Sequence, residues 1–284
     1  MENMLALWRN LPSNITPYLF EIGGFQLRYY SLMYLAAFLG VYLLIMRRIK
    51  VDGLPYTAEL VQDFFTWAIL GVIVGGRLGY VLFYNLGYYL RHPLEIILPF
   101  QFEGGVHFVG ISGMSYHGGA IAVLLFGIIF CLKRGIDFWR FADLFSSAIP
   151  LGYTFGRIGN FINGELYGRP TDMPWGMVFP LDQRHLLRHP SQLYEAFFEG
   201  IVLFIILWTI RKKFSFTGAI FACYIAGYGV TRFFIEFFRE PDSHLGFVYG
   251  PFSMGQILCL AMILTGVAIY QLRKIQAKKT GRLT

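Results

Sequence analysis

Charged residues are scarce in this sequence, making up 14% of its 284 residues against about 25% in an ordinary soluble domain. Apolar residues reach 56% instead. Several apolar runs approach or exceed the ~18 residues that a helix needs to cross a bilayer. This composition argues against a soluble globular domain and predicts an all-α polytopic membrane protein.

Cysteine is also scarce. Cys131, Cys223 and Cys259 all fall inside apolar runs and form no CxxC pair, which argues against a disulfide framework or a thiolate metal site. No His, Asp or Glu set has the spacing of a zinc or magnesium site, and no nucleotide-binding loop is present. We therefore expect neither a metal nor another cofactor. The N-terminus also lacks a signal-peptide pattern, and no internal repeat is visible.

The net charge of +7 does not indicate nucleic acid, because the basic residues sit in short clusters between apolar runs. These clusters punctuate every second connection, a pattern that places them in the cytoplasm by the positive-inside rule. They are Arg47-Arg48-Ile49-Lys50, Lys133-Arg134, Arg211-Lys212-Lys213 and the tail with Arg273, Lys274, Lys278, Lys279 and Arg282.

About seven transmembrane helices are expected, with the N-terminus outside and the C-terminus cytoplasmic. The expected spans are residues 29–46, 62–84, 113–132, 141–162, 192–210, 218–238 and 252–272. The chain then forms a single integral membrane domain over residues 1–284. Three polar segments, about 85–112, 163–191 and 239–251, would form a small external cap.

Charged residues inside these spans gather at one depth. Each lies seven or fewer residues from the predicted outer end of its span, which is within roughly 12 Å at about 1.5 Å per residue. Intramembrane charges are costly and commonly functional. The residues are Arg77, His117, Arg157, Glu195, Glu199, Arg232 and Glu236.

Each of these positions alone has an ordinary explanation. An arginine near a helix end can extend its head to the interface, Glu199 can be a packed carboxylate, and His117 can be a helix-packing histidine. Together they predict converging helices around a positively charged pocket that opens outward. Arginine suits phosphate oxygens, so a phospholipid head group in the outer leaflet fits this pocket. Histidine supplies a base whose pKa is near neutrality.

Four polar motifs provide most of the remaining evidence about function. The densest, residues 156–169, reads GRIGNFINGELYGR, and its glycines allow close backbone approach while its amides and Glu165 can orient an arginine. A helix-packing segment that ends in a turn would explain the glycines alone. The other three motifs are GMSYHGG at 113–119, RHPSQLYE at 188–195 and GYGVTR followed by IEFFR at 227–239.

Together these motifs resemble the prolipoprotein diacylglyceryl transferase family of bacterial inner membranes. The resemblance runs from Tyr30 through the tail and includes GGRLGY at 75–80 and SMGQ at 253–256. It implies transfer of the diacylglyceryl group of phosphatidylglycerol to the lipobox cysteine of a prolipoprotein signal peptide. A thioether forms and glycerol phosphate leaves, at a site toward the outer leaflet of the lipid bilayer.

The resemblance also implies roles for individual residues. His117 is the candidate base for the thiol, and Arg157 and Arg232 are expected to bind the phosphate and offset its developing charge. These three are the predicted catalytic residues. The predicted substrate-binding residues are Tyr30, Arg77, Asn160, Asn163, Glu165, Gly168, Gln192, Tyr194, Glu195, Tyr228 and Glu236.

Other functions remain open at this point. A transporter or binding protein for an anionic lipid or solute would favour a midplane site and a detectable repeat. A different lipid-modifying enzyme also fits the polar face. An intramembrane protease would need a Ser–His or paired-Asp arrangement, and the only serines near His117 are Ser112 and Ser115.

Overall fold

A computed structural model describes residues 2–23, 25–98, 100–101, 105–108, 113–240, 247–249 and 252–281. Parts of two expected cap segments, 85–112 and 239–251, therefore lie outside the described residues. The chain divides into two compact units, Met1–Asp52 with Ala142–Thr284, and Gly53–Phe141. The expectation of one integral domain stays a prediction.

Among the described residues, five helical stretches are long and apolar enough to cross a membrane. They are α3 (Tyr29–Asp52), α4 (Ala58–Tyr84), α6 (Tyr116–Arg134), the continuous α9–η2–α10 (Ser191–Glu195, Ala196–Val202, Leu203–Ile210) and α12 (Met254–Lys279). A shorter apolar helix, α11 (Ala219–Ile235), follows α10.

The expected span at 141–162 is not one continuous helix. It consists of α7 (Phe138–Ser146) and α8 (Ile149–Ile162), separated near Pro150 in the first turn of α8. Proline lacks an N–H and its ring collides with the carbonyl four residues earlier, whereas the first turn of a helix tolerates it. With 14 residues, α8 is about 21 Å long, less than the ~30 Å of a bilayer core.

The outer faces of the long helices are apolar. Along α3, Leu35, Leu39 and Leu43 are 66%, 58% and 56% exposed. A row of exposed leucines at helical spacing is unfavourable in water but matches a hydrocarbon surrounding. The chain is thus a helical, multi-pass membrane protein.

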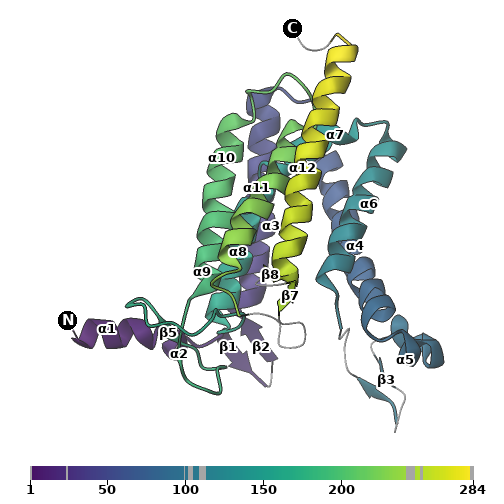
Figure 1. The fold of residues 1–284 in the computed structure, drawn as a ribbon. Coiled ribbons are helices and arrows are strands. Elements are labelled where there is room, and N and C mark those ends of the chain that lie inside the picture. The colour runs from purple at the N-terminus through teal and green to yellow at the C-terminus, as the bar shows by residue number, and fades with distance from the viewer. Residues whose placement is uncertain are drawn as a thin grey trace. The chain divides into compact units, whose positions relative to one another are not determined.

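In the first unit, α3 packs on α8, α11 packs on α12, and α10 contacts both α8 and α11 (Figure 1). Short antiparallel hairpins lie at the end of this bundle where α3, α9 and α12 begin and α8 ends (Figure 1). They are β1–β2 (Tyr18–Ile22, Phe25–Arg28), β5–β6 (Met177–Val178, Leu187–Arg188) and β7–β8 (Phe247–Tyr249, Phe252–Ser253). The N-terminal helices α1 (Glu2–Arg9) and α2 (Leu11–Asn14) contact β5.

At the opposite end of this bundle, buried polar side chains fix the helix termini. Both oxygens of Asp143 accept backbone N–H groups at the start of α11, from Gly218 at 2.7 Å and Phe221 at 2.8 Å. Arg48, which is 7% exposed, donates to Ser147 Oγ at 2.8 Å. Such contacts satisfy backbone groups that a helix end leaves unpaired. Arg48, a member of the first basic cluster, therefore also stabilises the fold.

The second unit is built on a close contact between α4 and α6. A Cβ on Gly79 would lie 2.7 Å from Gly118 Cα, and a Cβ on Gly118 would collide with Gly75 of α4. Small residues at these positions let the two backbones approach. After α4 come α5 (Leu86–Arg91), the 3₁₀ turn η1 (Pro93–Ile96) and the pair β3–β4 (Phe100–Gln101, His107–Phe108).

Candidate active site

A buried carboxylate, Glu195, lies at the centre of three arginines in the first unit. Its Oε2 is 2.9 Å from Arg157 Nε and 3.1 Å from Arg232 Nη1, and Arg239 Nη1 donates to its Oε1 at 3.3 Å. The Glu195 side chain is 0% exposed, whereas the three arginines keep between 15% and 18% exposure. The carboxylate therefore fixes the three guanidiniums by ion pairing, while part of each arginine side chain remains accessible to a ligand.

Two further carboxylates pair with Arg232. Glu236 Oε2 is 3.1 Å from Arg232 Nη2, and Glu199 Oε1 is 3.7 Å from Arg232 Nη1. Ser253 Oγ donates to Glu236 Oε1 at 3.1 Å. Three guanidiniums thus face three carboxyl groups, so the arginines of this cluster are ion-paired. Pairing is what makes charges tolerable at this burial.

A chain of amides holds Arg157 from its other side. Arg157 Nη1 donates to Asn160 Oδ1 at 3.2 Å, and Asn160 Nδ2 donates to Glu165 Oε1 at 2.8 Å. Asn163 Nδ2 shares the same oxygen at 3.3 Å, and Gln192 Nε2 donates to the Glu165 carbonyl at 2.6 Å. The densest motif and the start of α9 therefore act together to fix one guanidinium.

The helix that carries Glu195 and Glu199 is wound as a π-helix from Ala196 to Val202. Gly200 packs against Thr154 of α8, where a Cβ would lie 3.0 Å from Thr154 Cβ. The Thr154 hydroxyl lies 3.3 Å from the carbonyls of both Pro150 in its own helix and Ala196 in the widened turn. Short π segments of this kind are frequent at functional sites.

The segment after α8 is fastened to the residues after α11. Gly168 N donates to the His189 carbonyl at 2.8 Å, and Arg169 N donates to the Phe238 carbonyl at 2.9 Å. Arg169 Nε also donates to the Arg239 carbonyl at 2.7 Å. A Cβ on Gly168 would lie 2.8 Å from His189 Cβ, so glycine is required for this close approach.

A second ion pair holds the same segment. Arg188 donates from Nε and Nη2 to the two oxygens of Asp182, at 2.8 and 2.9 Å, and from Nη1 to Glu240 at 2.9 Å. The hydrogen bonds from Arg188 hold the pKa of Asp182 below its usual value. Because Arg188 pairs through two parallel hydrogen bonds with a nearly buried carboxylate and also reaches Glu240, it fastens the segment after α8 to the residues that follow α11.

Aromatic side chains lie against Arg157 and in the neighbouring segments. The guanidinium carbon of Arg157 lies 4.6 Å from the ring centre of Tyr153, and the Tyr153 and Tyr228 rings meet edge to face at 5.8 Å. Tyr194 Oη accepts a hydrogen bond from Trp175 Nε1 at 2.7 Å. Tyr30 Oη is 3.0 Å from Tyr34 Oη. Stacked rings both support a guanidinium and exclude water from it.

His117 belongs to the second unit, in the first turn of α6. Ser115 precedes it as the N-cap, and its Oγ accepts from Gly118 N at 3.2 Å. The His117 side chain is exposed. Its backbone is fixed by the close packing of Gly118 on α4, which explains the glycine that directly follows the histidine.

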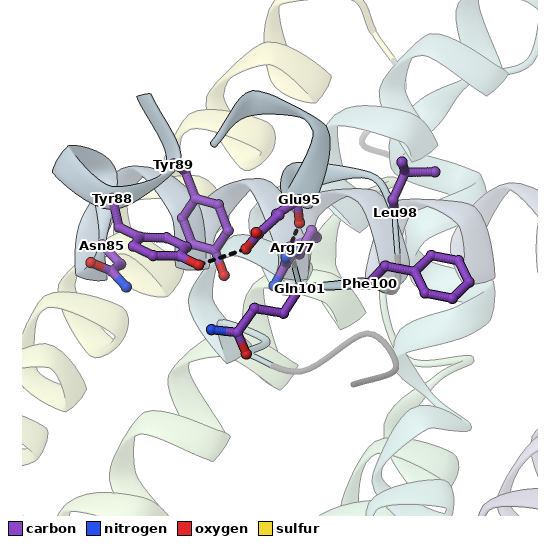
Figure 2. A pocket seen from close by; sticks show the side chains of 8 residues that line it. All are labelled: Arg77, Asn85, Tyr88, Tyr89, Glu95, Leu98, Phe100 and Gln101. Carbon is purple, nitrogen blue, oxygen red and sulfur yellow. Dashed lines mark hydrogen bonds between the residues drawn. The ribbon is translucent and has the colours of Figure 1, made fainter. Parts of the chain in front are cut away.

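Arg77 also belongs to the second unit and binds backbone groups. Its guanidinium donates to the carbonyls of Ile96 at 2.9 Å, Gly113 at 3.5 Å and Glu95. Figure 2 shows it beneath Glu95, which accepts a hydrogen bond from Tyr88 Oη at 2.7 Å. Arg77 thereby fastens the segments on either side of residues 99–112 to α4.

A cavity of about 290 Å³ opens beside Arg77. Its lining mixes hydroxyl, amide and aromatic groups (Figure 2). The lining residues are Arg77, Asn85, Tyr88, Tyr89, Glu95, Leu98, Phe100 and Gln101.

The structure brings most predicted site residues of the first unit into one network. Arg157, Asn160, Asn163, Glu165, Gln192, Glu195, Arg232 and Glu236 are joined by the contacts above, and Gly168 borders them. Sequence reasoning left Tyr153, Arg239 and Ser253 without a role, and it counted Glu199 among the gathered charges without assigning it to the site. Tyr153 lies one helical turn before Arg157, which is the signal that could have found it.

No three His, Cys, Asp or Glu side chains are grouped as metal ligands within the described ranges. The expectation that no metal is needed stays a prediction.

Comparison with known proteins identifies the family. The family model described as prolipoprotein diacylglyceryl transferase matches residues 17–272. A phosphatidylglycerol–prolipoprotein diacylglyceryl transferase of Chlorobaculum tepidum is 53% identical over 98% of this chain and 96% of its own length. Proteins of the same name from Bordetella avium and Geobacter sulfurreducens are 49% and 45% identical, over 90% and 94% of this chain and 94% and 98% of their own. The chain therefore belongs to the prolipoprotein diacylglyceryl transferase family.

Proposed function

We propose that this membrane enzyme transfers the diacylglyceryl group of phosphatidylglycerol to a prolipoprotein, a step of lipoprotein maturation. The family and the names of its relatives support the reaction. The acceptor is the thiol of a lipobox cysteine at the end of the signal peptide, and the product is a thioether.

The observation that carries the proposal is the pair of guanidiniums, Arg157 and Arg232, held 2.9 and 3.1 Å from one oxygen of a buried carboxylate. Two helices thus present fixed positive groups with an open edge. A phosphodiester carries one negative charge and presents two free oxygens, which match guanidinium donors. The pair is suited to bind the lipid phosphate before reaction and to stabilise it as it leaves.

In the reaction the thiolate attacks the glycerol carbon that bears the phosphate. The carbon–sulfur bond forms, the carbon–oxygen bond breaks, and glycerol phosphate departs with the bonding electrons. Its charge rises from one to two negative units, and fixed donors that meet this new charge each contribute on the order of 3 kcal/mol. On the family resemblance, His117 is the candidate group that takes the thiol proton.

The remaining residues bind and orient the substrates. Asn160, Asn163 and Glu165 hold Arg157, while Glu195 and Glu236 hold Arg232. Gln192 and Gly168 shape the border of the cluster. Tyr30, Arg77, Tyr194 and Tyr228 are assigned to the lipid-binding region on the family resemblance, and for Arg77 the three carbonyl contacts support a positioning role.

The enzyme lies in the bacterial inner membrane with about seven crossings, the N-terminus outside and the site toward the outer leaflet. The alternation of basic connections supports this orientation. The hairpins gathered at the end of the bundle that carries the site suit an external cap. The short α8 would require the membrane to be thinner at the site, or α7 to complete the crossing.

The test uses purified protein, phosphatidylglycerol vesicles and a synthetic lipobox peptide, with the same peptide carrying serine in place of cysteine as the control. Mass spectrometry is expected to find one diacylglyceryl unit on the cysteine peptide and none on the serine peptide, with one glycerol phosphate released per adduct. Lipid binding without an adduct would contradict transfer and favour a lipid-binding protein.

A further inference from the structure

One tyrosine hydroxyl lies between two buried carboxyl groups. Tyr153 Oη is 3.2 Å from Glu195 Oε2 and closer still to Glu199 Oε2. A phenol carries a single hydrogen, so it can donate to only one of the two carboxyl groups. The other contact would bring two electron-rich oxygens together unless one of these groups carries an additional proton.

The surroundings identify Glu199 as the carrier of that proton. Glu195 faces three guanidiniums within 3.3 Å, which favours its ionised form. Glu199 has one guanidinium at 3.7 Å, is 0% exposed, and its Oε1 has no hydrogen-bond partner in the described part of the chain. An ionised carboxylate so poorly paired and sealed from water is unfavourable, and the neutral acid is the low-energy form.

We infer that Glu199 and Tyr153 form a protonated pair that sets the charge of the arginine cluster and positions Arg232 for the lipid phosphate. This inference rests on the proposed function of the same site. With Glu199 neutral, three guanidiniums face the two carboxylates Glu195 and Glu236, so the cluster carries one net positive charge. That charge matches one phosphodiester.

Charged and titratable groups face Glu199 from every helix packed around it, and each of them influences whether Glu199 is protonated. They are Tyr153 and Arg157 from α8, Glu195 from its own helix, Tyr228 and Arg232 from α11 and Cys259 from α12. Arg232 lies between Glu195 and Glu199, so a charge that appears on Glu199 is felt directly at the predicted phosphate site.

A pH dependence follows from this arrangement. When rising pH removes the proton from Glu199, a negative charge appears beside Arg232 and cancels the net positive charge of the cluster. The KM for phosphatidylglycerol is therefore expected to rise on the alkaline side while kcat changes less. Glutamine at position 199 imitates the neutral acid and should abolish this alkaline rise.

The protonation itself can be measured without any turnover. Infrared spectra of the purified protein in detergent, at neutral pH, are expected to contain the carbonyl band of a buried protonated carboxylic acid. The band should disappear in Glu199→Gln and shift in frequency in Tyr153→Phe, which removes the hydrogen-bond partner and keeps the ring. Absence of the band in the parent protein, or its persistence unchanged in both variants, overturns the inference while leaving the proposed reaction intact.

A matched kinetic pair then tests the role in positioning. Glu195 and Glu199 lie one turn apart and are equally buried. Glu195→Gln is expected to lower kcat/KM by more than about 100-fold, because three guanidiniums lose their common partner. Glu199→Gln is expected to lower it by less than about tenfold, the size of one neutral hydrogen bond. Equal losses in the two variants, or an alkaline rise in KM that persists in Glu199→Gln, would show that Glu199 is ionised or that its charge does not reach the phosphate site.

Discussion

Lysine in place of Arg232 keeps the positive charge but removes the planar fork that reaches two carboxylates at once. Arg232 Nη1 lies 3.1 Å from Glu195 and Nη2 lies 3.1 Å from Glu236. A single ammonium group cannot hold both contacts, so one close ion-pair contact is lost. A close charge pair of this kind is worth about 1.5–3 kcal/mol, which corresponds to a roughly 10- to 150-fold fall in kcat/KM.

Alanine at the same position removes the phosphate contact as well, and we expect a loss of at least about 10²–10³-fold. The assay is the initial rate of peptide lipidation at several phosphatidylglycerol fractions, with thermal unfolding in detergent to verify folding. Arg239→Lys is the matched control, because Arg239 makes a single contact with Glu195 at 3.3 Å that an ammonium can retain. A lysine at 232 that is as active as the parent, or no more impaired than Arg239→Lys, would refute the bidentate role of Arg232.

Three further changes probe the base, the backbone and the cap. His117→Gln is expected to slow transfer by at least about 10²-fold in initial-rate assays; near-normal turnover would assign the thiol proton to another group. Gly168→Ala places a Cβ 2.8 Å from His189 Cβ and should cost about 1–3 kcal/mol of stability, measured by denaturation of the solubilised protein, whereas an unchanged midpoint would contradict the close approach. Arg188 lowers the pKa of Asp182, so this carboxylate contributes stability that is present above its unfolded pKa of about 3.9 and is lost as pH falls through the lower folded value. Asp182→Asn should therefore lower the melting temperature at neutral pH and flatten its decline in acid; a parallel decline in both proteins would dismiss the pair as a stabilising element.

The sequence allowed the helical membrane character and the family to be predicted, and both are confirmed. Long apolar runs are typical of membrane-spanning helices. The motif from Gly156 to Arg169 is specific enough to identify relatives. The gathering of Arg157, Glu195 and Arg232 was also predictable, because buried charges on different helices require one another. The number of spans, the orientation and the chemical roles of the residues stay predictions.

Other features depend on contacts that no single segment reveals. The break before α8 follows from Pro150, yet an apolar run around a proline can be either a kinked span or two helices. The π-helix after Glu195 depends on Thr154 packing against Gly200, a contact between helices that are distant in sequence. Arg77 was assigned to substrate from its depth and motif. The carbonyl groups it binds lie in the short 3₁₀ turn η1 and at Gly113, and no pattern in the sequence predicts that these groups meet Arg77.

The sharpest test of the arginine clamp is the mass of a lipobox peptide after incubation with Arg157→Ala and, in parallel, with the parent protein, in phosphatidylglycerol vesicles. Both proteins must first show the same unfolding transition, so that a lost activity reports the site and not the fold. We expect the parent to add one diacylglyceryl unit to the cysteine and to release one glycerol phosphate, and Arg157→Ala to yield no detectable adduct. Full lipidation by Arg157→Ala would contradict the phosphate clamp on which the proposed mechanism depends.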